Sequence, residues 1–465
     1  MIPYPSDVTF GEGASAGALD LAEHVFSGPP EIAGLLAELG LPVAGDWDLD
    51  DGFADEGYWL RAGADGLKVR GRLAGLRWAV QTLRQLGEPV PFVEIRDAPR
   101  YPWRGSLLDV ARWCHPIEFL HRYVDLMAMY KLNRLHLHLT DDQGWRFEVK
   151  RYSLLTEVGG RRAESMKGHY YNFEFDGVPH GGHYTQQQMR DLVAYARRRG
   201  VEIMPEIDLP GHTQAAIAAY PRLGNDRDRP IEVSTRWYLH DTVLNTHPET
   251  VEFFKHVLDE VMEVFPFEYV HLGGDEAALT EWSNSPAALE TVRSLGLSGV
   301  DKLLGWWIAG LQQHLVAHGR KTAVWDELLE ADPPAGLLFF GWRKEHRALQ
   351  AREAGFDAIS CPMRYTYFDW AESLRPGEPT AVNGFVPLEK AYSFEPGDVT
   401  GVQGQLWCEY LPTPALVEYR AFPRLAALAE VGWSRRRDYP AFLSRLRRHL
   451  PTLDALKVNY RPLDE

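Results

Sequence analysis

The chain has 465 residues, enough for a barrel domain of about 250 residues together with an accessory domain. Hydrophobic residues make up 45% and charged residues 25%, the balance of an ordinary globular protein with a large buried core. The formal net charge of -16 argues against a nucleic-acid partner, because phosphate binding needs clustered Lys and Arg.

The cysteines and the start of the chain give expectations about compartment. Cys114, Cys361 and Cys408 are scattered and odd in number, which fits neither a disulfide framework nor a zinc-ligand spacing. The opening segment MIPYPSDVTF lacks the basic and apolar regions of a signal peptide, and no uninterrupted apolar run reaches about 18 residues. We therefore expect a cytoplasmic protein without a membrane segment.

Residues 1–100 are expected to form a small α+β domain. The segment LAGLRWAVQTLRQLG has apolar residues at helical spacing and a stop at Gly87, and a stretch punctuated by Gly and Asp precedes it. Short strands mixed with helices are typical of this class. The following segment EPVPFVEIRDAPRYPW contains four prolines and is the expected junction with a second domain, residues 101–465.

In the second domain, eight short apolar runs alternate with stretches of helical periodicity. The runs are 104–110, 133–140, 201–208, 269–276, 321–327, 336–342, 356–362 and 402–407. Eight such alternations predict an α/β fold, a (β/α)8 barrel of parallel strands. A doubly wound open sheet uses the same alternation, but no glycine-rich dinucleotide fingerprint follows an early strand.

Polar or aromatic residues follow nearly every one of these predicted strands. The active site of a (β/α)8 barrel lies at the carboxyl ends of its strands. We therefore expect the residues at these eight strand ends to meet at the mouth of the barrel and form the active site. The residues, in chain order, are Arg112, Asp141, His212, Asp275 with Glu276, Trp325, Trp342, Tyr367 with Asp369, and Trp407 with Glu409.

Two adjacent carboxylates close the fourth run, in the segment HLGGDE. Like charges side by side raise each other's pKa, so one of Asp275 and Glu276 can stay protonated as a general acid while the other is ionised. A helix N-terminus, where acidic residues are favourable against the dipole, is the structural alternative for this pair.

Histidines near two strand ends have more than one interpretation. In PEIDLPGH, which holds Glu206 and Asp208, His212 could tune a neighbouring acid or be an ordinary buried histidine. In HLHLTDDQGW, His136 and His138 share one face of a strand. Some metal-dependent barrel hydrolases begin with such a pair, so a metal site remains an alternative, although its further ligands are not evident.

These segments resemble glycoside hydrolase family 20, the β-N-acetylhexosaminidases. The resemblance runs from Tyr101 to Trp433 through LLDVARW, KLNRLHLHLTDDQGWR, VEIMPEIDLPGHT, YVHLGGDE, TAVWDE, YTYFD, QLWCE and YRAFPRLAALAEVGWS. It implies a (β/α)8 barrel after a small α+β domain, and an exo-acting enzyme that hydrolyses terminal β-linked GlcNAc or GalNAc with neither cofactor nor metal. Which of these sugars is preferred, and whether the remainder is a chitooligosaccharide or another glycan, is not implied.

The resemblance also implies a role for each candidate residue. Glu276 is expected to be the general acid and then the general base, while Asp275 accepts the acetamido N–H and stabilises the positive charge that develops there. Tyr367 donates to the acetamido oxygen as that oxygen attacks C1. The remaining expectations are an aromatic wall from Trp325, Trp342 and Trp407, hydroxyl contacts from Arg112, Glu409 and Asp369, and support behind Glu276 from His212 with Asp141.

Two departures and two alternatives stay open. Trp113 stands where the family commonly has His. The long stretch 161–185 is expected to form a lid and subsite wall, with a mere insertion at the barrel mouth as the alternative, and its Tyr170, Tyr171 and Phe173 would equally suit an oligomer contact. One alternative is a catalytically silent sugar-binding protein. The other is a metal-dependent barrel hydrolase whose ligands come from His136, His138, His212, His271 and Asp275.

Overall fold

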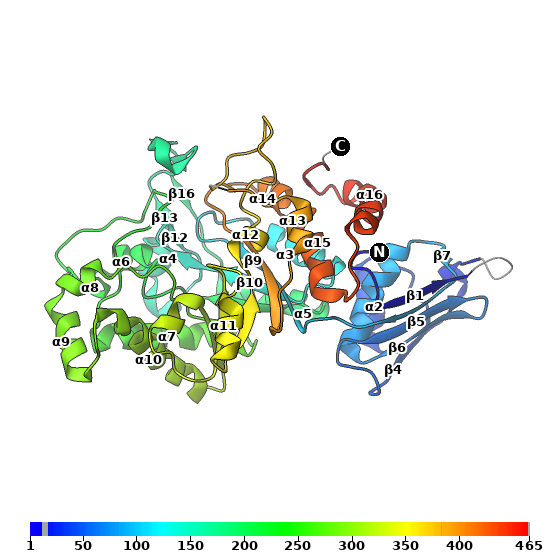
Figure 1. Cartoon of the computed structure of the whole chain (residues 1–465), viewed down its shortest axis with the longest axis horizontal. Helices are drawn as coiled ribbons and strands as arrows, with labels where there is room; N and C mark the ends of the chain where they lie inside the picture. The colour runs from blue at the N-terminus through cyan, green and yellow to red at the C-terminus, as the bar shows by residue number, and fades with distance from the viewer. Residues whose placement is uncertain (12–16, 383, 464–465) are drawn as a thin grey trace.

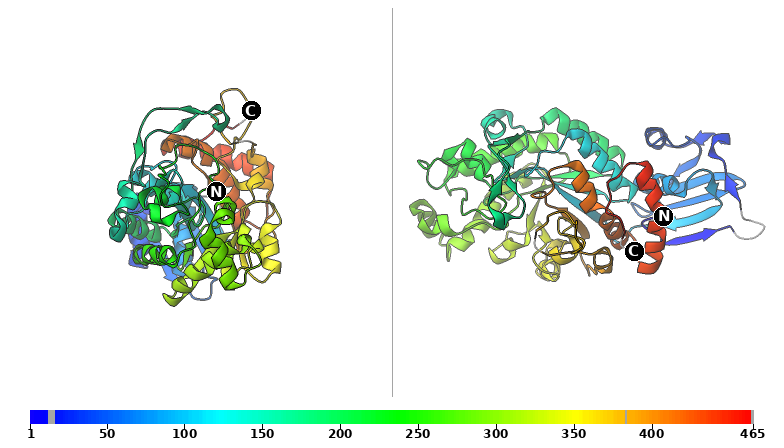
Figure 2. Two further views of the ribbon diagram at one scale, coloured as in Figure 1. Left: turned by 90° about the vertical axis from the view of Figure 1, so that its left-hand side faces the viewer. Right: turned by 90° about the horizontal axis from the view of Figure 1, so that it is seen from above.

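The computed structural model describes residues 1–11, 17–382 and 384–463, and it contains the two folding units expected from the sequence (Figure 1). A small α+β unit lies at one end of an elongated molecule, and a closed barrel of parallel strands surrounded by helices forms the rest (Figure 2). The expected fold class is confirmed. Within the described residues, no helix is long and apolar enough to cross a membrane.

The α+β unit is a six-stranded sheet in the order β1-β8-β5-β6-β4-β3 with two helices. Helix α2 (Leu73–Leu86) is the helix predicted from its periodicity, and it ends where Gly87 adopts a φ of 82°. The strands are β1 (Asp7–Phe10), β3 (Phe26–Ser27), β4 (Gly45–Leu49), β5 (Tyr58–Gly63), β6 (Gly66–Gly71) and β8 (Val93–Asp97); the other helix is α1 (Pro30–Glu38), and β2 (Ala18–Leu19) pairs with β7 (Val90–Pro91).

Eight parallel strands form the barrel, and each falls within or beside one of the eight predicted runs. The last strand pairs with the first and closes the sheet. The strands are β9 (Trp103–Asp109), β10 (Arg134–His138), β17 (Glu202–Glu206), β18 (Tyr269–His271), β19 (Lys321–Trp325), β20 (Leu337–Gly341), β21 (Asp357–Ser360) and β22 (Gly401–Leu406).

The fourth barrel strand is shorter than its apolar run. The run 269–276 predicts a strand up to the two carboxylates, but β18 ends at His271. Gly273 and Gly274 have φ angles of 68° and 97°, which a strand residue does not adopt. Asp275 and Glu276 therefore lie on a loop beyond the strand.

Amphipathic helices cover the outside of the barrel. In α7 (Pro248–Val264), for example, the buried positions Phe253, Phe254, Val257, Leu258 and Val261 follow a three- and four-residue spacing. The other helices of the barrel unit are α3 (Ile117–Met129), α4 (Leu154–Glu157), α5 (Gln186–Arg198), α6 (Gln214–Ala219), α8 (Thr280–Asn284), α9 (Pro286–Leu295), α10 (Leu303–Ala317), α11 (Arg347–Glu353), α12 (Met363–Thr366), α13 (Leu388–Ser393), α14 (Pro414–Ala421), α15 (Arg424–Trp433) and α16 (Tyr439–Ala455).

A buried ion pair joins the two units. The ammonium of Lys131, after α3, lies 2.9 Å from an Asp97 carboxylate oxygen at the end of β8. The same ammonium lies 4.3 Å from the ring centre of Trp433, whose indole N–H donates to the other Asp97 oxygen at 2.9 Å. All three residues are buried. The α+β unit is thus attached to the end of α15 by a charge pair enclosed in aromatic rings.

This junction predicts a large cost for leaving its lysine unpaired. Asp97→Ala should lower the free energy of unfolding by about 3–5 kcal/mol, because it removes one partner of a buried ion pair. Urea unfolding followed by tryptophan fluorescence measures the loss, since Trp433 lies at the junction. As a control, Asp65→Ala breaks an exposed ion pair with Lys68 and should leave stability nearly unchanged. Equal effects of the two substitutions would contradict this account of the junction.

Candidate active site

The residues predicted from the strand ends all line one cavity at the mouth of the barrel. Its volume is about 250 Å³. The eleven predicted residues on its wall are Arg112, Asp141, His212, Asp275, Glu276, Trp325, Trp342, Tyr367, Asp369, Trp407 and Glu409, and Met363, Trp370 and Val382 complete the lining. Each of the eight barrel strands ends in or is followed by at least one of these lining residues.

A tight turn places the two carboxylates at this mouth. Gly273, just after β18, has a positive φ, and a Cβ built on it would lie only 1.6 Å from the Asp208 carboxylate. The backbone N–H of Gly274 donates to the same Asp208 oxygen at 3.3 Å. Glu276 itself has a φ of 48°. Helix α8 begins only at Thr280, so the pair is not at a helix N-terminus.

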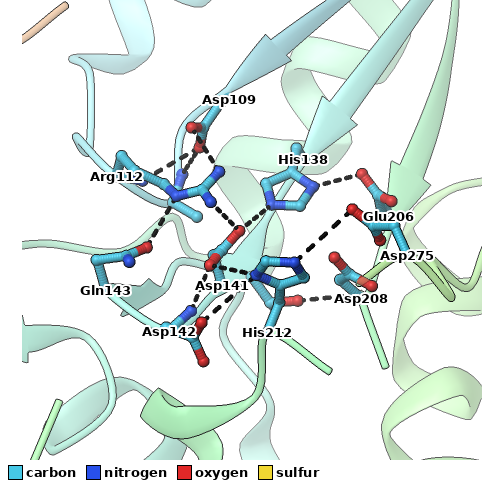
Figure 3. Close-up of polar contacts among 12 residues, drawn as sticks. Asp109, Arg112, His138, Asp141, Asp142, Gln143, Glu206, Asp208, His212 and Asp275 are labelled. Carbon is cyan, nitrogen blue, oxygen red and sulfur yellow. Dashed lines mark hydrogen bonds and ion pairs between the residues drawn. The ribbon is translucent and has the colours of Figure 1, made fainter. Parts of the chain in front are cut away.

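His212 connects these carboxylates to the floor of the cavity. Its Nδ1 lies 3.2 Å from Asp141 and its Nε2 lies 3.8 Å from Asp275 (Figure 3). The same Nε2 lies 3.6 Å from Glu276. Burial opposes a charge on His212, but the adjacent Asp141 carboxylate outweighs it, so the pKa of His212 is raised well above its usual value. His212 is therefore a cation beside both acids.

Asp275 is the buried member of the pair. Burial raises its pKa to about 6, although the nearby His212 cation acts in the opposite direction. Its Oδ1 is buried without a hydrogen-bond partner among the described residues. The side chain of Glu276 is more exposed. Asp275 thus carries an acceptor oxygen that no described group satisfies, and Glu276 lines the same cavity as the more exposed of the two.

Aromatic rings make the wall next to Asp275. The rings of Trp342 and Tyr367 are stacked at 5.9 Å, and those of Trp325 and Trp407 lie 5.9 Å apart. The indoles of Trp325 and Trp342 are each held by a carboxylate. Trp325 Nε1 donates to Glu206 at 2.8 Å, and Trp342 Nε1 donates to Glu327 at 3.1 Å.

A second polar group lies on the side of the cavity formed by β9 and β22. Arg112 pairs with Asp141 at 2.8 Å and lies 3.9 Å from Glu409. Glu409 Oε2 and Asp369 Oδ1 are buried without hydrogen-bond partners among the residues described. Burial raises the pKa of both carboxyls; Arg112 partly offsets it for Glu409, whereas Glu409 reinforces it for Asp369. Both residues line the cavity, so their carboxyl groups are candidates for hydrogen bonds to ligand hydroxyls.

The supporting carboxylates Glu206 and Glu327 were not among the predicted site residues. Both lie in segments that hold a predicted residue, Glu206 in PEIDLPGH and Glu327 in TAVWDE. Their role is visible only where an indole N–H reaches them across the barrel. Spacing in the chain cannot report that contact, because Trp325 and Glu206 come from different strands.

The five candidate metal ligands do not converge on one point. His136 and His271 approach Glu206 beneath the cavity, whereas His212 approaches Asp275 and Glu276 inside it. Among the described residues, no group of three or more potential ligand atoms within 4.8 Å of one another contains more than two of those five residues. The five residues therefore do not form the single ligand set that the metal-dependent alternative requires.

Trp113 and the stretch 161–185 form a wall behind Arg112. The guanidinium of Arg162 lies 4.7 Å from the ring centre of Trp113 and 5.0 Å from that of Trp237, and it donates to the carbonyl of Arg112 at 2.7 Å. The stretch contains two short pairings, β13 (Arg161–Arg162) with β16 (His180–Gly181) and β14 (Met166–Lys167) with β15 (Glu174–Phe175). None of its residues lines the cavity itself, but Met166, Lys167, Gly168 and Asp176 line a neighbouring pocket together with Trp113 and Glu409. Whether its exposed Tyr171 and Phe173 contact another copy stays a prediction.

Both parts of the chain match models of one family. "Glycosyl hydrolase family 20, catalytic domain" covers residues 101–436, and "Glycosyl hydrolase family 20, domain 2" covers residues 2–98. A β-hexosaminidase of Akkermansia muciniphila is 36% identical over 385 residues, or 78% of this chain and 75% of that protein. One from Porphyromonas gingivalis is 36% identical over 442 residues, or 88% of this chain. The chain spans only 55% of the Porphyromonas protein and 62% of a similar one from Vibrio furnissii.

Solved structures are similar over nearly the whole chain. An exo β-N-acetylglucosaminidase from Vibrio harveyi, in complex with N-acetylglucosamine, has a TM-score of 0.90 at 32% identity and covers 99% of this chain and 78% of its own. A mutant β-hexosaminidase of Streptomyces plicatus, in complex with the product GlcNAc, has a TM-score of 0.84 at 29% identity and covers 99% and 96%.

The turn at Gly273 predicts an unequal response to two alanine substitutions. Gly273→Ala should destabilise the protein by more than the roughly 1–2 kcal/mol that a positive φ alone costs, because the added Cβ meets Asp208. Gly319→Ala is the control, since Gly319 has a φ of 72° and nothing within 4 Å of an added Cβ. Thermal unfolding compares the two variants. Equal destabilisation would mean that the turn can move away from Asp208.

Proposed function

Because this chain belongs to glycosyl hydrolase family 20, we propose that it is an exo-acting, retaining β-N-acetylhexosaminidase that removes terminal, non-reducing β-linked GlcNAc or GalNAc. The observation that carries the proposal is the pair at the mouth: Asp275 buried with a carboxylate oxygen that no described group satisfies, and Glu276 the more exposed of the two. The names of the similar proteins, and the GlcNAc bound in two of the similar structures, support the substrate class.

The proposed reaction uses the substrate's own acetamido group as nucleophile. Its carbonyl oxygen attacks C1 while Glu276 protonates the leaving glycosidic oxygen, and the C1–O bond breaks to give an oxazolinium ion. Glu276 then takes a proton from water, which attacks C1 and reopens the ring. Two inversions at C1 give net retention. No enzyme nucleophile is required, so the carboxylate spacing of ordinary retaining glycosidases does not apply.

Asp275 is positioned to make the acetamide a better nucleophile. Its unpartnered oxygen can accept the acetamido N–H, and its negative charge then stabilises the cation that forms. The interaction is strongest after charge has developed, so it lowers the barrier more than it strengthens substrate binding. Holding the acetamide beside C1 contributes through orientation, on the order of 7–11 kcal/mol in favourable intramolecular reactions.

The far side of the cavity supports exo action on an unmodified sugar. A volume of about 250 Å³ suits one sugar residue, and the wall of Arg112, Glu409 and Asp369 offers hydrogen bonds to ring hydroxyls. A phosphate or sulfate ester on the terminal sugar would be repelled by the carboxylates of Glu409 and Asp369. We therefore expect free hydroxyls on the sugar that is removed.

The experiment that tests the function is hydrolysis of aryl β-GlcNAc, β-GalNAc and β-glucoside, each with and without EDTA. We expect cleavage of the acetamido sugars in both conditions and none of the glucoside. Comparable cleavage of the glucoside would contradict an acetamido nucleophile, and loss of activity in EDTA would restore the metal alternative. No cleavage of any substrate would favour a silent sugar-binding protein.

The proposed acid role of Glu276 predicts a dependence on the leaving group. Glu276→Gln cannot protonate the departing oxygen, so kcat/KM should fall on the order of 10²–10⁴-fold for poor leaving groups. It should fall far less for dinitrophenyl glycosides, whose leaving group needs no proton. Because kcat/KM reports the first chemical step, the comparison excludes the later role of Glu276 as base. Equal losses across the series would refute the acid assignment.

The raised pKa of Asp275 predicts how kcat/KM falls at acidic pH. Only ionised Asp275 can stabilise the cation, and burial raises its pKa to about 6. As pH falls through that value the carboxylate gains a proton, so log(kcat/KM) should decline with a slope approaching one per pH unit. Initial rates between pH 4 and 8 on an aryl β-GlcNAc measure this, with circular dichroism to check that the protein stays folded. A flat profile down to pH 4.5 would contradict the assignment.

A further inference from the structure

A buried carboxylate that the proposed reaction does not use lies directly beneath the cavity. Glu206, the last residue of β17, has no exposed surface. Each of its two oxygens contacts a different part of the site: Oε1 meets Trp325 and lies 2.8 Å from His271 Nδ1, whereas Oε2 meets His138 and lies 3.1 Å from His136 Nε2. An ionised carboxylate without water is costly unless its oxygens are hydrogen-bonded or paired, so these contacts determine where Glu206 can lie.

The first oxygen of Glu206 holds the aromatic wall. Oε1 accepts a hydrogen bond from the indole Nε1 of Trp325 at 2.8 Å. Trp325 lines the cavity, and its ring lies 5.9 Å from that of Trp407. A hydrogen bond to a charged acceptor is stronger than one between neutral groups, so Glu206 restricts the rotation of this indole.

The second oxygen of Glu206 reaches the opposite side of the site through His138. Oε2 bonds with His138 Nδ1, and His138 Nε2 lies 2.9 Å from Asp141 (Figure 3). Burial opposes a charge on His138, but the Glu206 carboxylate outweighs it, and the pKa of His138 is raised well above its usual value. A protonated His138 donates from both ring nitrogens, one to each carboxylate.

Asp141 in turn contacts Arg112 on one side of the cavity and His212 on the other. One of its oxygens lies 2.8 Å from Arg112, and the other lies 3.2 Å from His212, which approaches Glu276. Glu206, His138, Asp141 and Arg112 thus alternate in charge along a buried chain. Each side chain has opposite charges as neighbours and cannot rotate without losing one of them.

We propose that Glu206 is a positioning residue that holds the Trp325 wall and the His138–Asp141 relay in one fixed relation. The inference rests on the proposed function, since the two groups so joined are the acetamido wall and the support of the general acid. Glu206 touches neither substrate nor reacting atoms. Its effect on turnover is exerted through the residues that it aligns.

The contacts require a carboxylate rather than an amide. Trp325 and His138 both present N–H donors, and only a carboxylate has an acceptor oxygen for each. A glutamine at this position has one oxygen and one NH2 group. Turned toward His138, the NH2 forces that ring to lose a proton; turned toward Trp325, it opposes the indole N–H. Glu206→Gln therefore breaks one branch with almost no change in volume.

The test is a double-mutant cycle between Glu206→Gln and Trp325→Phe on an aryl β-GlcNAc. In the wild-type background, Glu206→Gln should lower kcat/KM about 10- to 100-fold, the scale expected when reacting groups are misaligned. The Ki of a thiazoline analogue of the intermediate should rise by a similar factor. In the Trp325→Phe background the indole branch is already lost, so the loss from Glu206→Gln should be at least threefold smaller.

Met204→Ala is the matched control. Met204 lies two residues earlier on β17 and is fully buried in the same inner layer as Trp325, and its side chain has no hydrogen bond to any residue that the structure describes. Its truncation should lower the melting temperature, while its effect on kcat/KM multiplies with that of Trp325→Phe. The positioning role would be overturned if the effects of Glu206→Gln and Trp325→Phe on kcat/KM also multiplied. It would likewise be overturned if Glu206→Gln lowered the melting temperature without changing kcat/KM.

Crystal structures give a result that does not depend on turnover. In the Glu206→Gln variant either the Trp325 indole or the His138 ring should leave its wild-type position, and unchanged positions of both would overturn the inference. If that variant does not fold, Glu206→Asp applies the same test, because the shorter side chain cannot span both donors. An inactive wild-type enzyme would refute the proposed function alone, while the displacement of these rings would still decide the role of Glu206.

Discussion

The need to pair every buried charge organises the mouth of this barrel. Asp141 has almost no exposed surface, yet its carboxylate is surrounded by three cationic groups, from Arg112, His138 and His212. Burial by itself would raise the pKa of Asp141, but Arg112 and His212 hold it well below the usual value. Since none of these charges is stable alone in a dry interior, each side chain specifies the position of the others.

This pairing allows opposite electrostatic environments to exist within a few ångströms. Asp141 is ionised among cations, whereas Asp275, Asp369 and Glu409 each have a buried oxygen that no described group satisfies. Their pKa values are raised mainly by that burial. All three residues line the cavity. In the proposed reaction, a sugar with an acetamido N–H and free hydroxyls would supply the hydrogen bonds that they lack.

Packing explains why the scaffold can hold such an arrangement. The inner barrel layer around Trp325, Phe340 and Met204 excludes water from below the cavity, so Glu206 and its histidine partners interact in a low dielectric. At the other end of the barrel, Lys131 and Asp97 use the same principle to attach the α+β unit. Pairing of buried charges with aromatic cover thus serves both the site and the junction between units.

The sequence by itself determined the alternation of strands and helices and the set of residues at the strand ends, because periodicity and chain order are local properties. It therefore predicted the barrel and the lining of the cavity from Arg112 to Glu409. Only the tertiary structure decided that β18 ends at His271, that the histidines of β10 and β18 surround Glu206, and that Glu327 holds Trp342. Such contacts join separate strands, and their formation depends on backbone turns and burial that no spacing in the chain encodes.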